Sequence, residues 1–258
     1  MKNNDRLLSR ILSRRKALTL FKAAGTAILV VGCVPKKSNS LVLSSIGVSA
    51  SSTASLATLP ACVVSPEQTE GPYFVDEKLN RSDIRSDPAD GSVKDGVPLQ
   101  LTLQVSKIGS TGCTPLAGAI VDIWHCDAQG IYSDVTDRSF NTVGKKFLRG
   151  YQVTDANGTV QFTTIYPGWY QGRATHIHFK VRTDATSGQS SEFTSQLYFD
   201  DSISDRVYAL SPYSSKGQRT MKNAEDGIFQ NGGDQMLLKL AKNGQGYAAT
   251  FNVGLQMA

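Results

Sequence analysis

The pair His176-Ile177-His178 has the residue types and the spacing for metal binding. In a β-strand, residues two apart point to the same face, so both imidazoles can reach one ion while Ile177 packs on the other side. The chain holds three histidines in all, and two of them lie in this short segment. An H-x-H pair alone also occurs at surfaces and in partly buried strands, so further donors must decide between these interpretations.

Tyrosine is the anionic donor nearest to this histidine pair. The segment 166–178 contains Tyr166 and Tyr170 but no Cys, Asp or Glu. A structural zinc site prefers Cys and His, and an iron(II) facial triad needs a carboxylate, so this segment supplies neither set. A phenolate is a hard oxygen donor, and only a highly charged cation lowers its pKa, normally near 10, enough for binding as an anion. These residues therefore indicate Fe(III).

Several motifs follow one another along the chain in the order found in the intradiol ring-cleavage dioxygenases, and the chain resembles that family over about residues 60–200. The motifs are PEQTEGPY at 66–73, LAGAIVDIWHCDAQGIY at 116–132, FLRGYQ at 147–152 and PGWYQGRATHIHFKV at 167–181, with SQLYF at 195–199. The resemblance implies an enzyme that uses O2 to open a catechol ring between its two hydroxylated carbons. The expected product is a cis,cis-muconate-type diacid.

Carried over position by position, the resemblance implies four protein ligands of a non-haem Fe(III), namely Tyr132, Tyr170, His176 and His178. It also implies that the catechol loses two protons on binding and that Tyr170 receives one of them. The third histidine, His125, is interpreted as structural or as a support of the site. Asp122 and Asp127 are interpreted as turn or supporting residues rather than ligands.

The same resemblance assigns residues to the substrate side of the iron. Arg173 matches an arginine that stabilises negative charge developing on the ring. Gln196 matches a position near the oxygen-binding side, so Arg173, Tyr170 and Gln196 form the expected catalytic set. Thr69 and Tyr73 match a segment that borders the substrate pocket. Together with Arg173, they are the expected substrate-binding residues.

The substrate is not fixed by these motifs. Ring substituents are expected to contact the loops 134–146 and 211–231, whose placement the sequence does not give. The helical N-terminal region of catechol-type relatives is not found, which favours a protocatechuate-like or single-domain arrangement, and the oligomeric state stays open. Two alternatives remain: an exported iron- or catecholate-binding β-sandwich protein without turnover, and a hydrolase with zinc on the H-x-H pair.

The elements that must position these residues are expected to be β-strands. Residues 98–105 alternate, with Leu99, Leu101, Leu103 and Val105 on one face. Similar short runs follow at 119–125, 159–165, 176–182 and 195–199, separated by Gly-containing turns. The pattern predicts an all-β, antiparallel β-sandwich whose long loops form the metal site. Its one later helix candidate is 233–241.

The front of the chain is typical of an export signal. Residues 13–33 carry basic residues, then an apolar run of about ten residues that is too short for the ~20 of a membrane span, then Gly32-Cys33. Arg14-Arg15 suits a twin-arginine route, and Cys33 suits a lipoprotein cleavage site, with an ordinary small-residue cleavage site as the alternative. We therefore expect an export signal at 1–33, a Ser/Ala/Thr-rich tether at 34–60 and a catalytic domain at 61–258. The protein would be periplasmic or anchored to a bacterial membrane through Cys33.

The distribution of charge and the number of cysteines bear on the partners and the disulfide bonds of the protein. Nine of the 27 Lys and Arg, but one of the 22 acidic residues, fall in residues 1–37, so the remaining chain is slightly acidic. That balance argues against nucleic-acid binding. Beyond Cys33 the chain has Cys62, Cys113 and Cys126, of which one pair is expected to form a disulfide bond in an oxidising compartment. The sequence does not choose the pair.

Overall fold

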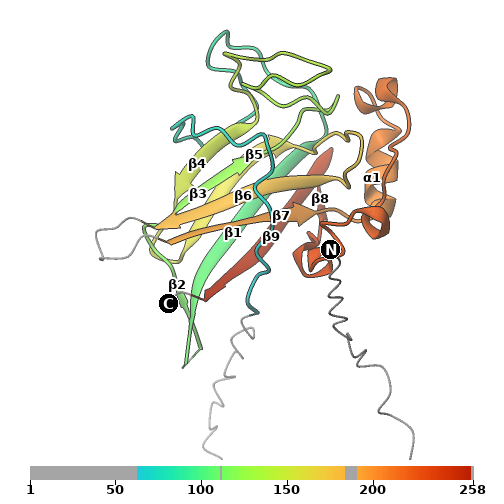
Figure 1. Ribbon diagram of the computed structural model, residues 1–258. Helices are drawn as coiled ribbons and strands as arrows, with labels where there is room; N and C mark the ends of the chain where they lie inside the picture. Colours follow the sequence, from blue (N-terminus) through green and yellow to red (C-terminus); the bar gives the residue numbers. More distant parts are fainter. Residues whose placement is uncertain (1–62, 111, 184–190, 257–258) are drawn as a thin grey trace, which may run out of the picture. The chain divides into compact units, whose positions relative to one another are not determined.

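The protein is described here by a computed structural model that covers residues 63–110, 112–183 and 191–256, all within the unit Ala57–Ala258 (Figure 1). Residues 1–62, including the expected signal, the whole expected tether, Cys33 and Cys62, lie outside the described residues.

The strands of the described chain form two β-sheets. The first consists of β1 (Pro98–Gly109), β2 (Gly112–Pro115), β5 (Thr159–Ile165), β8 (Ala241–Asn243) and β9 (Gly246–Gln256), in the order β2-β1-β9-β8 with β5 also paired to β1. The second consists of β4 (Arg149–Val153), β3 (Ile120–Trp124), β6 (His176–Thr183) and β7 (Ser191–Tyr198), in the order β4-β3-β6-β7. The predicted all-β sandwich is confirmed.

One strand pair departs from the antiparallel prediction. β1 and β9 run parallel, with Leu99 opposite Tyr247 at one end and Ile108 opposite Gln256 at the other. A parallel pair needs a crossover connection, and here that connection, residues 110–245, contains all the other strands of the described chain. Because this pairing joins segments that are far apart in the sequence, no local sequence pattern could indicate it.

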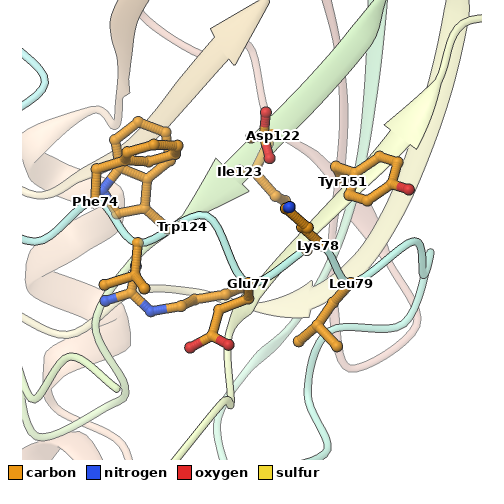
Figure 2. A pocket seen from close by; sticks show the side chains of 11 residues that line it. Phe74, Glu77, Lys78, Leu79, Asp122, Ile123, Trp124 and Tyr151 are labelled. Carbon is orange, nitrogen blue, oxygen red and sulfur yellow. The ribbon is translucent and has the colours of Figure 1, made fainter. Parts of the chain in front are cut away.

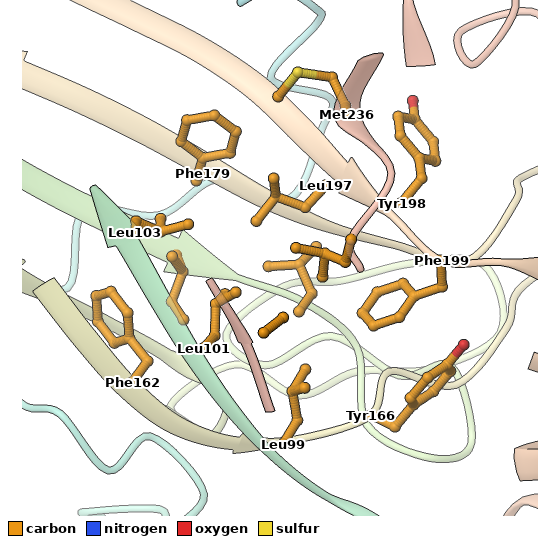
Figure 3. Close-up of a cluster of buried hydrophobic side chains, with 14 of the residues drawn as sticks. Leu99, Leu101, Leu103, Phe162, Tyr166, Phe179, Leu197, Tyr198, Phe199 and Met236 are labelled. Atoms are coloured by element: carbon orange, nitrogen blue, oxygen red, sulfur yellow. The ribbon is translucent and has the colours of Figure 1, made fainter. Parts of the chain in front are cut away.

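The core lies between the two sheets. Leu99, Leu101 and Leu103 of β1 are at most 1% exposed, as their alternation predicted, and they share one cluster with Phe179 and Leu197 of the second sheet (Figure 3). Burial of each such side chain contributes about 1.5–3 kcal/mol relative to exposure. This packing fixes which face of β6 is turned inward.

The short helices depart from the sequence prediction. α1 (Asp201–Tyr208) was not predicted, although Asp200 caps it through the backbone N–H groups of Ser202 and Ile203. The predicted helix at 233–241 is wrong: only the 3-10 turn η4 (Gly233–Met236) forms, and the chain is extended from Leu237 onward. Two further 3-10 turns are η2 (Tyr213–Lys216) and η3 (Asn223–Glu225). No helix among the described residues is long and apolar enough to cross a membrane.

The outer face of β6 positions the predicted site. Ile177, Phe179 and Val181 belong to the core cluster, so His176 and His178 project from the opposite face of the strand. The connection 125–148 between β3 and β4 and the later part of the connection 63–97 before β1 lie at one end of the sandwich (Figure 1). These two connections supply Thr69, Tyr73 and Tyr132. Tyr170 and Arg173 lie between β5 and β6, and Gln196 lies on β7.

Candidate metal centre and active site

Four donor side chains meet at the start of β6. The Nε2 atoms of His176 and His178 are 3.0 Å apart, and the Tyr170 hydroxyl is 3.1 Å from His176 Nε2. The Tyr132 ring lies 5.7 Å from the Tyr170 ring and 6.2 Å from the His178 ring, measured between centroids. The structure therefore brings together all four residues that the resemblance implied as iron ligands.

Both imidazoles are neutral and can donate electron pairs. Nδ1 of His176 lies 2.6 Å from the Ala174 carbonyl oxygen, which can only accept, so Nδ1 carries the proton and Nε2 the lone pair. Burial, with Arg173 adding to it, lowers the pKa of His176 to about 3. Burial also lowers the pKa of His178 well below its ordinary value, and the Trp124 ring stacks on this imidazole at 4.9 Å.

The two tyrosines fit a highly charged cation. The Tyr132 hydroxyl is buried and has no hydrogen-bond partner within the described part of the chain. Burial raises the pKa of Tyr132 and of Tyr170 above the ordinary value, so neither ionises at neutral pH without a nearby positive charge. A buried polar group without a partner costs about 1–3 kcal/mol, and binding a cation would remove that cost.

The donor set distinguishes this site from other metal sites. The described residues contain no group of three or more His, Cys, Asp or Glu that could hold a metal ion, so a site here needs the tyrosines. Two neutral nitrogens and two phenol oxygens suit Fe(III), because hard anionic oxygens favour a highly charged ion. These four residues therefore fit a ferric ion, whereas they supply zinc with only two of its usual ligands and calcium with no carboxylate or carbonyl oxygen.

The turn before Tyr132 is held by Asp127 and Gly130. Oδ1 of Asp127 accepts hydrogen bonds from the backbone N–H groups of Gln129 and Ile131, at 2.9 and 3.0 Å. Gly130 has φ of 75°, and a side chain there would overlap the carbonyl group of Trp169. The structure places Asp127 in a turn, as the sequence analysis interpreted it.

His125 and Asp122 are also engaged away from the donors. Nδ1 of His125 donates to the Cys126 carbonyl at 2.8 Å, and its Nε2 lies 2.7 Å from the Thr164 hydroxyl. Asp122 forms an ion pair with Arg182 at 2.8 Å. With both ring nitrogens occupied, His125 acts as a structural residue.

Arg173 lies beside the donors, and Gln196 is bonded to Arg173. Nε of Arg173 donates to Asp226 at 2.9 Å, Nη2 donates to Gln196 Oε1 at 2.5 Å, and Nη1 lies 3.5 Å from His176 Nε2. The amide of Gln196 donates to the backbone carbonyl of Thr69 at 2.8 Å. Thr69 thus supports Gln196 through its backbone, while its own side chain is exposed.

Asp226 was missed in the sequence analysis. It is 1% exposed and lies in the loop 211–231, which was expected only to contact ring substituents. A single Asp in a polar loop carries no local signal of a partner 53 residues away. Its role becomes visible only where the loop packs against Arg173.

Tyr73 forms a wall of the site. Its ring stacks on Tyr132 with centroids 4.5 Å apart and meets Tyr170 edge-on at 6.3 Å. Its hydroxyl donates to Asp137 at 2.8 Å, which ties it to the loop 134–146. Burial, together with Asp137, raises the pKa of Tyr73 to about 12, so it is a neutral phenol. The structure thus places Tyr73 beside both expected ligand tyrosines.

A small cavity lies close to this region but is not the substrate site (Figure 2). Its volume is ≈ 10 Å³, and its lining includes Glu77, Trp124 and Arg149 but none of the four donors. Each of these three side chains has a buried polar atom without a hydrogen-bond partner in the described chain. That volume suits about one water molecule, whereas ligand pockets hold several hundred Å³.

Two of the four cysteines, Cys113 and Cys126, lie within the described residues. Cys113 is disulfide-bonded, and Cys126 is free and buried. The prediction of one disulfide bond and one unpaired thiol in the body is met for these two residues. Cys62 and Cys33 lie outside the described residues.

The fold and the site together define a β-sandwich protein in which two tyrosines and two histidines meet, and comparison with known proteins identifies its family. Residues 69–213, more than half of the chain, match the family described as Dioxygenase. A solved intradiol ring-cleavage dioxygenase from Tetranychus urticae is 34% identical, with a TM-score of 0.65 over 76% of this chain and 95% of that one. The chain belongs to the intradiol ring-cleavage dioxygenase family.

Curated relatives match over shorter stretches. Chlorocatechol 1,2-dioxygenase of Pseudomonas putida is 32% identical over 103 residues, 33% of this chain and 36% of that protein. The protocatechuate 3,4-dioxygenase beta chain of Burkholderia cepacia is 32% identical over 117 residues, 42% of this chain and 48% of that protein. The chain thus spans between a third and a half of the length of these two relatives.

Proposed function

We propose that this protein is a non-haem iron(III) dioxygenase that opens a catechol-type ring with O2 and releases a cis,cis-muconate-type diacid. The observation that carries the proposal is the meeting of two neutral imidazole nitrogens with two phenol oxygens, of which that of Tyr132 is buried without a partner, and without a carboxylate. The names of the curated relatives, which act on chlorocatechol and protocatechuate, support a catechol as the substrate class.

Tyr170 supplies a base for one of the two protons that the substrate loses. Ferric iron, when bound by the four donors, would supply the Lewis acidity that makes both catechol hydroxyls acidic. Tyr170 Oη would receive one of the two substrate protons, because burial raises the pKa of this hydroxyl and so favours its protonated form. Burial of the Tyr132 side chain shields its oxygen from competing water.

Arg173 and Tyr73 orient and stabilise the substrate. The Arg173 guanidinium stabilises negative charge that develops on the ring, and its contacts with Asp226 and Gln196 hold it in place beforehand. A fixed cation of this kind needs no reorganisation during the reaction. Tyr73 offers a flat aromatic wall next to the donors, against which a catechol ring can pack.

The test begins with the purified protein reconstituted with Fe(III). We expect a visible phenolate-to-iron absorption band that shifts when catechol, protocatechuate or hydroxyquinol is added, with oxygen uptake and diacid formation for at least one of them. Tyr132→Phe should weaken the band, whereas the matched control Tyr151→Phe on β4 should leave it unchanged. Colour without oxygen uptake would indicate an iron- or catecholate-binding protein, and a protein that binds no ferric iron would refute the site.

We also propose that the protein is exported and held at a bacterial membrane through a lipid on Cys33. The basic and apolar pattern of residues 1–33 supports this, with Arg14-Arg15 favouring the twin-arginine route. Metabolic labelling with a radioactive fatty acid should mark the wild-type protein and leave Cys33→Ala unlabelled. Recovery of unlabelled wild-type protein in the periplasmic fraction would support export without a lipid anchor.

A further inference from the structure

Lys216 is a half-buried cation at the end of η2. Its Nζ donates hydrogen bonds to the backbone carbonyl oxygens of Gln129 and Trp169, the latter at 2.6 Å, and lies 4.7 Å from the centre of the Trp169 ring. Burial lowers the pKa of Lys216, so an ammonium group here is costly unless it is compensated. The compensation comes from two carbonyl dipoles and an aromatic face.

The two carbonyl groups belong to the two loops that bear the tyrosine donors. Gln129 lies three residues before Tyr132, and Trp169 directly precedes Tyr170. Lys216 is 87 residues from the first acceptor and 47 from the second. One ammonium group therefore joins two ligand loops that are separate in the sequence.

The two loops touch each other through their backbones. The N–H of Gly168 donates to the Asp127 carbonyl at 3.1 Å. A side chain at Gly168 would overlap the carbonyl oxygens of Asp127 and Ala128, and one at Gly130 would overlap Trp169 and the Lys216 ammonium. Glycine on both sides allows an approach that any other residue would prevent.

Contacts around η2 hold Lys216 against both loops. The side-chain amide of Gln129 donates to the Pro212 carbonyl at 2.7 Å, on one side of the turn. The indole N–H of Trp169 donates to the Gly217 carbonyl at 3.2 Å, on the other side. Each ligand loop thus has two independent contacts with the segment that carries Lys216.

We propose that Lys216 is a positioning residue that fixes the placement of Tyr132 relative to Tyr170, and thereby the donor arrangement offered to the ferric ion. This inference rests on the proposed function, because it concerns the same ion. Without the ammonium group, the two carbonyls lose a shared donor and the loops can separate. The four donor side chains themselves are unchanged by such a substitution.

The test compares ferric affinity and the absorption band across a set of variants of the full protein. Lys216→Met keeps the length of the side chain and removes the charge and the donors, and Lys216→Gln keeps one donor group. The matched control is Lys242→Met, because Lys242 also lies over an aromatic ring, 4.1 Å from the centre of Tyr247, but on the exposed strand β8. Ferric affinity is measured by competition with a chelator, and the phenolate-to-iron band by visible spectroscopy.

We expect Lys216→Met to bind ferric iron at least about tenfold more weakly and to shift the band, with Lys216→Gln intermediate and Lys242→Met equal to wild type. Circular dichroism checks that each variant is folded. If Lys216→Met does not fold, the ferric affinity and the band of Lys216→Gln test the proposal. Wild-type affinity and an unshifted band in a folded Lys216 variant would overturn the proposal, even if thermal stability fell. Absence of any band in the wild-type protein would instead refute the proposed function, and this inference with it.

Discussion

Replacing Asp226 with Asn should damage both stability and catalysis. The carboxylate of Asp226 is buried and uses both oxygens: Oδ2 accepts from Arg173 Nε and from the Ala174 N–H, and Oδ1 accepts from the N–H groups of Ile228 and Phe229. Asn has the same shape, but one of its two terminal groups is an NH2 donor. In either orientation, that NH2 group faces two donors that have no other acceptor there.

The magnitude follows from those contacts. Each buried donor left without an acceptor costs about 1–3 kcal/mol, so Asp226→Asn, which leaves two, should lower the free energy of unfolding by about 2–6 kcal/mol. Burial alone would raise the pKa of Asp226, but the Ala174 N–H and the charge of Arg173 outweigh it and lower the pKa. The contribution of this carboxylate to stability is therefore present above its unfolded pKa near 4 and is lost as the pH falls below that value.

Urea denaturation at pH 7 measures the stability change, and steady-state oxygen uptake measures the catalytic one. We expect kcat to fall about a hundredfold, because Arg173 loses its fixed orientation. The matched control is Asp83→Asn, since Asp83 pairs with Arg85 at 2.7 Å but is half exposed and should cost no more than about 1 kcal/mol. Equal stability losses in the two variants, or an unchanged kcat in Asp226→Asn, would refute this reasoning.

Three further predictions concern single side chains. Burial lowers the pKa of His125 to about 4 from 6.5, so between these pH values the unfolded chain binds a proton that the folded protein does not. The folded protein should therefore lose about 3 kcal/mol of stability as the pH falls from 6.5 to 4. His125→Gln should abolish this loss, which urea titrations at several pH values will measure. Burial raises the pKa of the Cys126 thiol, which donates to the Gly168 carbonyl, so iodoacetamide should alkylate it only after unfolding; equal rates in native and denatured protein would contradict this. Tyr73→Phe keeps the ring stack and loses the hydrogen bond to Asp137, so KM should rise several-fold while the free energy of unfolding changes by about 1 kcal/mol or less. If even Tyr73→Ala left the kinetics unchanged, Tyr73 would not contact the substrate.

Local sequence patterns were sufficient wherever the signal repeats along one strand. The alternation of Leu99, Leu101 and Leu103 predicted β1, and the same period of two predicted that His176 and His178 share a face of β6. A period of two is a property of any extended chain, so it survives whatever the strand later pairs with. The resemblance then named the tyrosines, which no periodicity could indicate.

Elements whose stability comes from distant partners were beyond the sequence. β9 was not predicted, although it forms the longest pairing of the fold, because its register with β1 is set across almost the whole domain. The predicted helix at 233–241 failed because tertiary pairing at Leu237 and β8 competes with a short and weakly helical segment.

By itself, the sequence determined the fold class and the family and predicted the four donor residues, because these depend on local periodicity and on motifs of contiguous residues. Only the tertiary structure decided what holds those donors. Asp226 reaches Arg173 across 53 residues, and Lys216 reaches the two tyrosine loops across 47 and 87. A charged residue must have a partner only once folding has removed water from it, and here the partners meet only when the chain has closed these long loops. The sequence alone therefore does not show which residues pair.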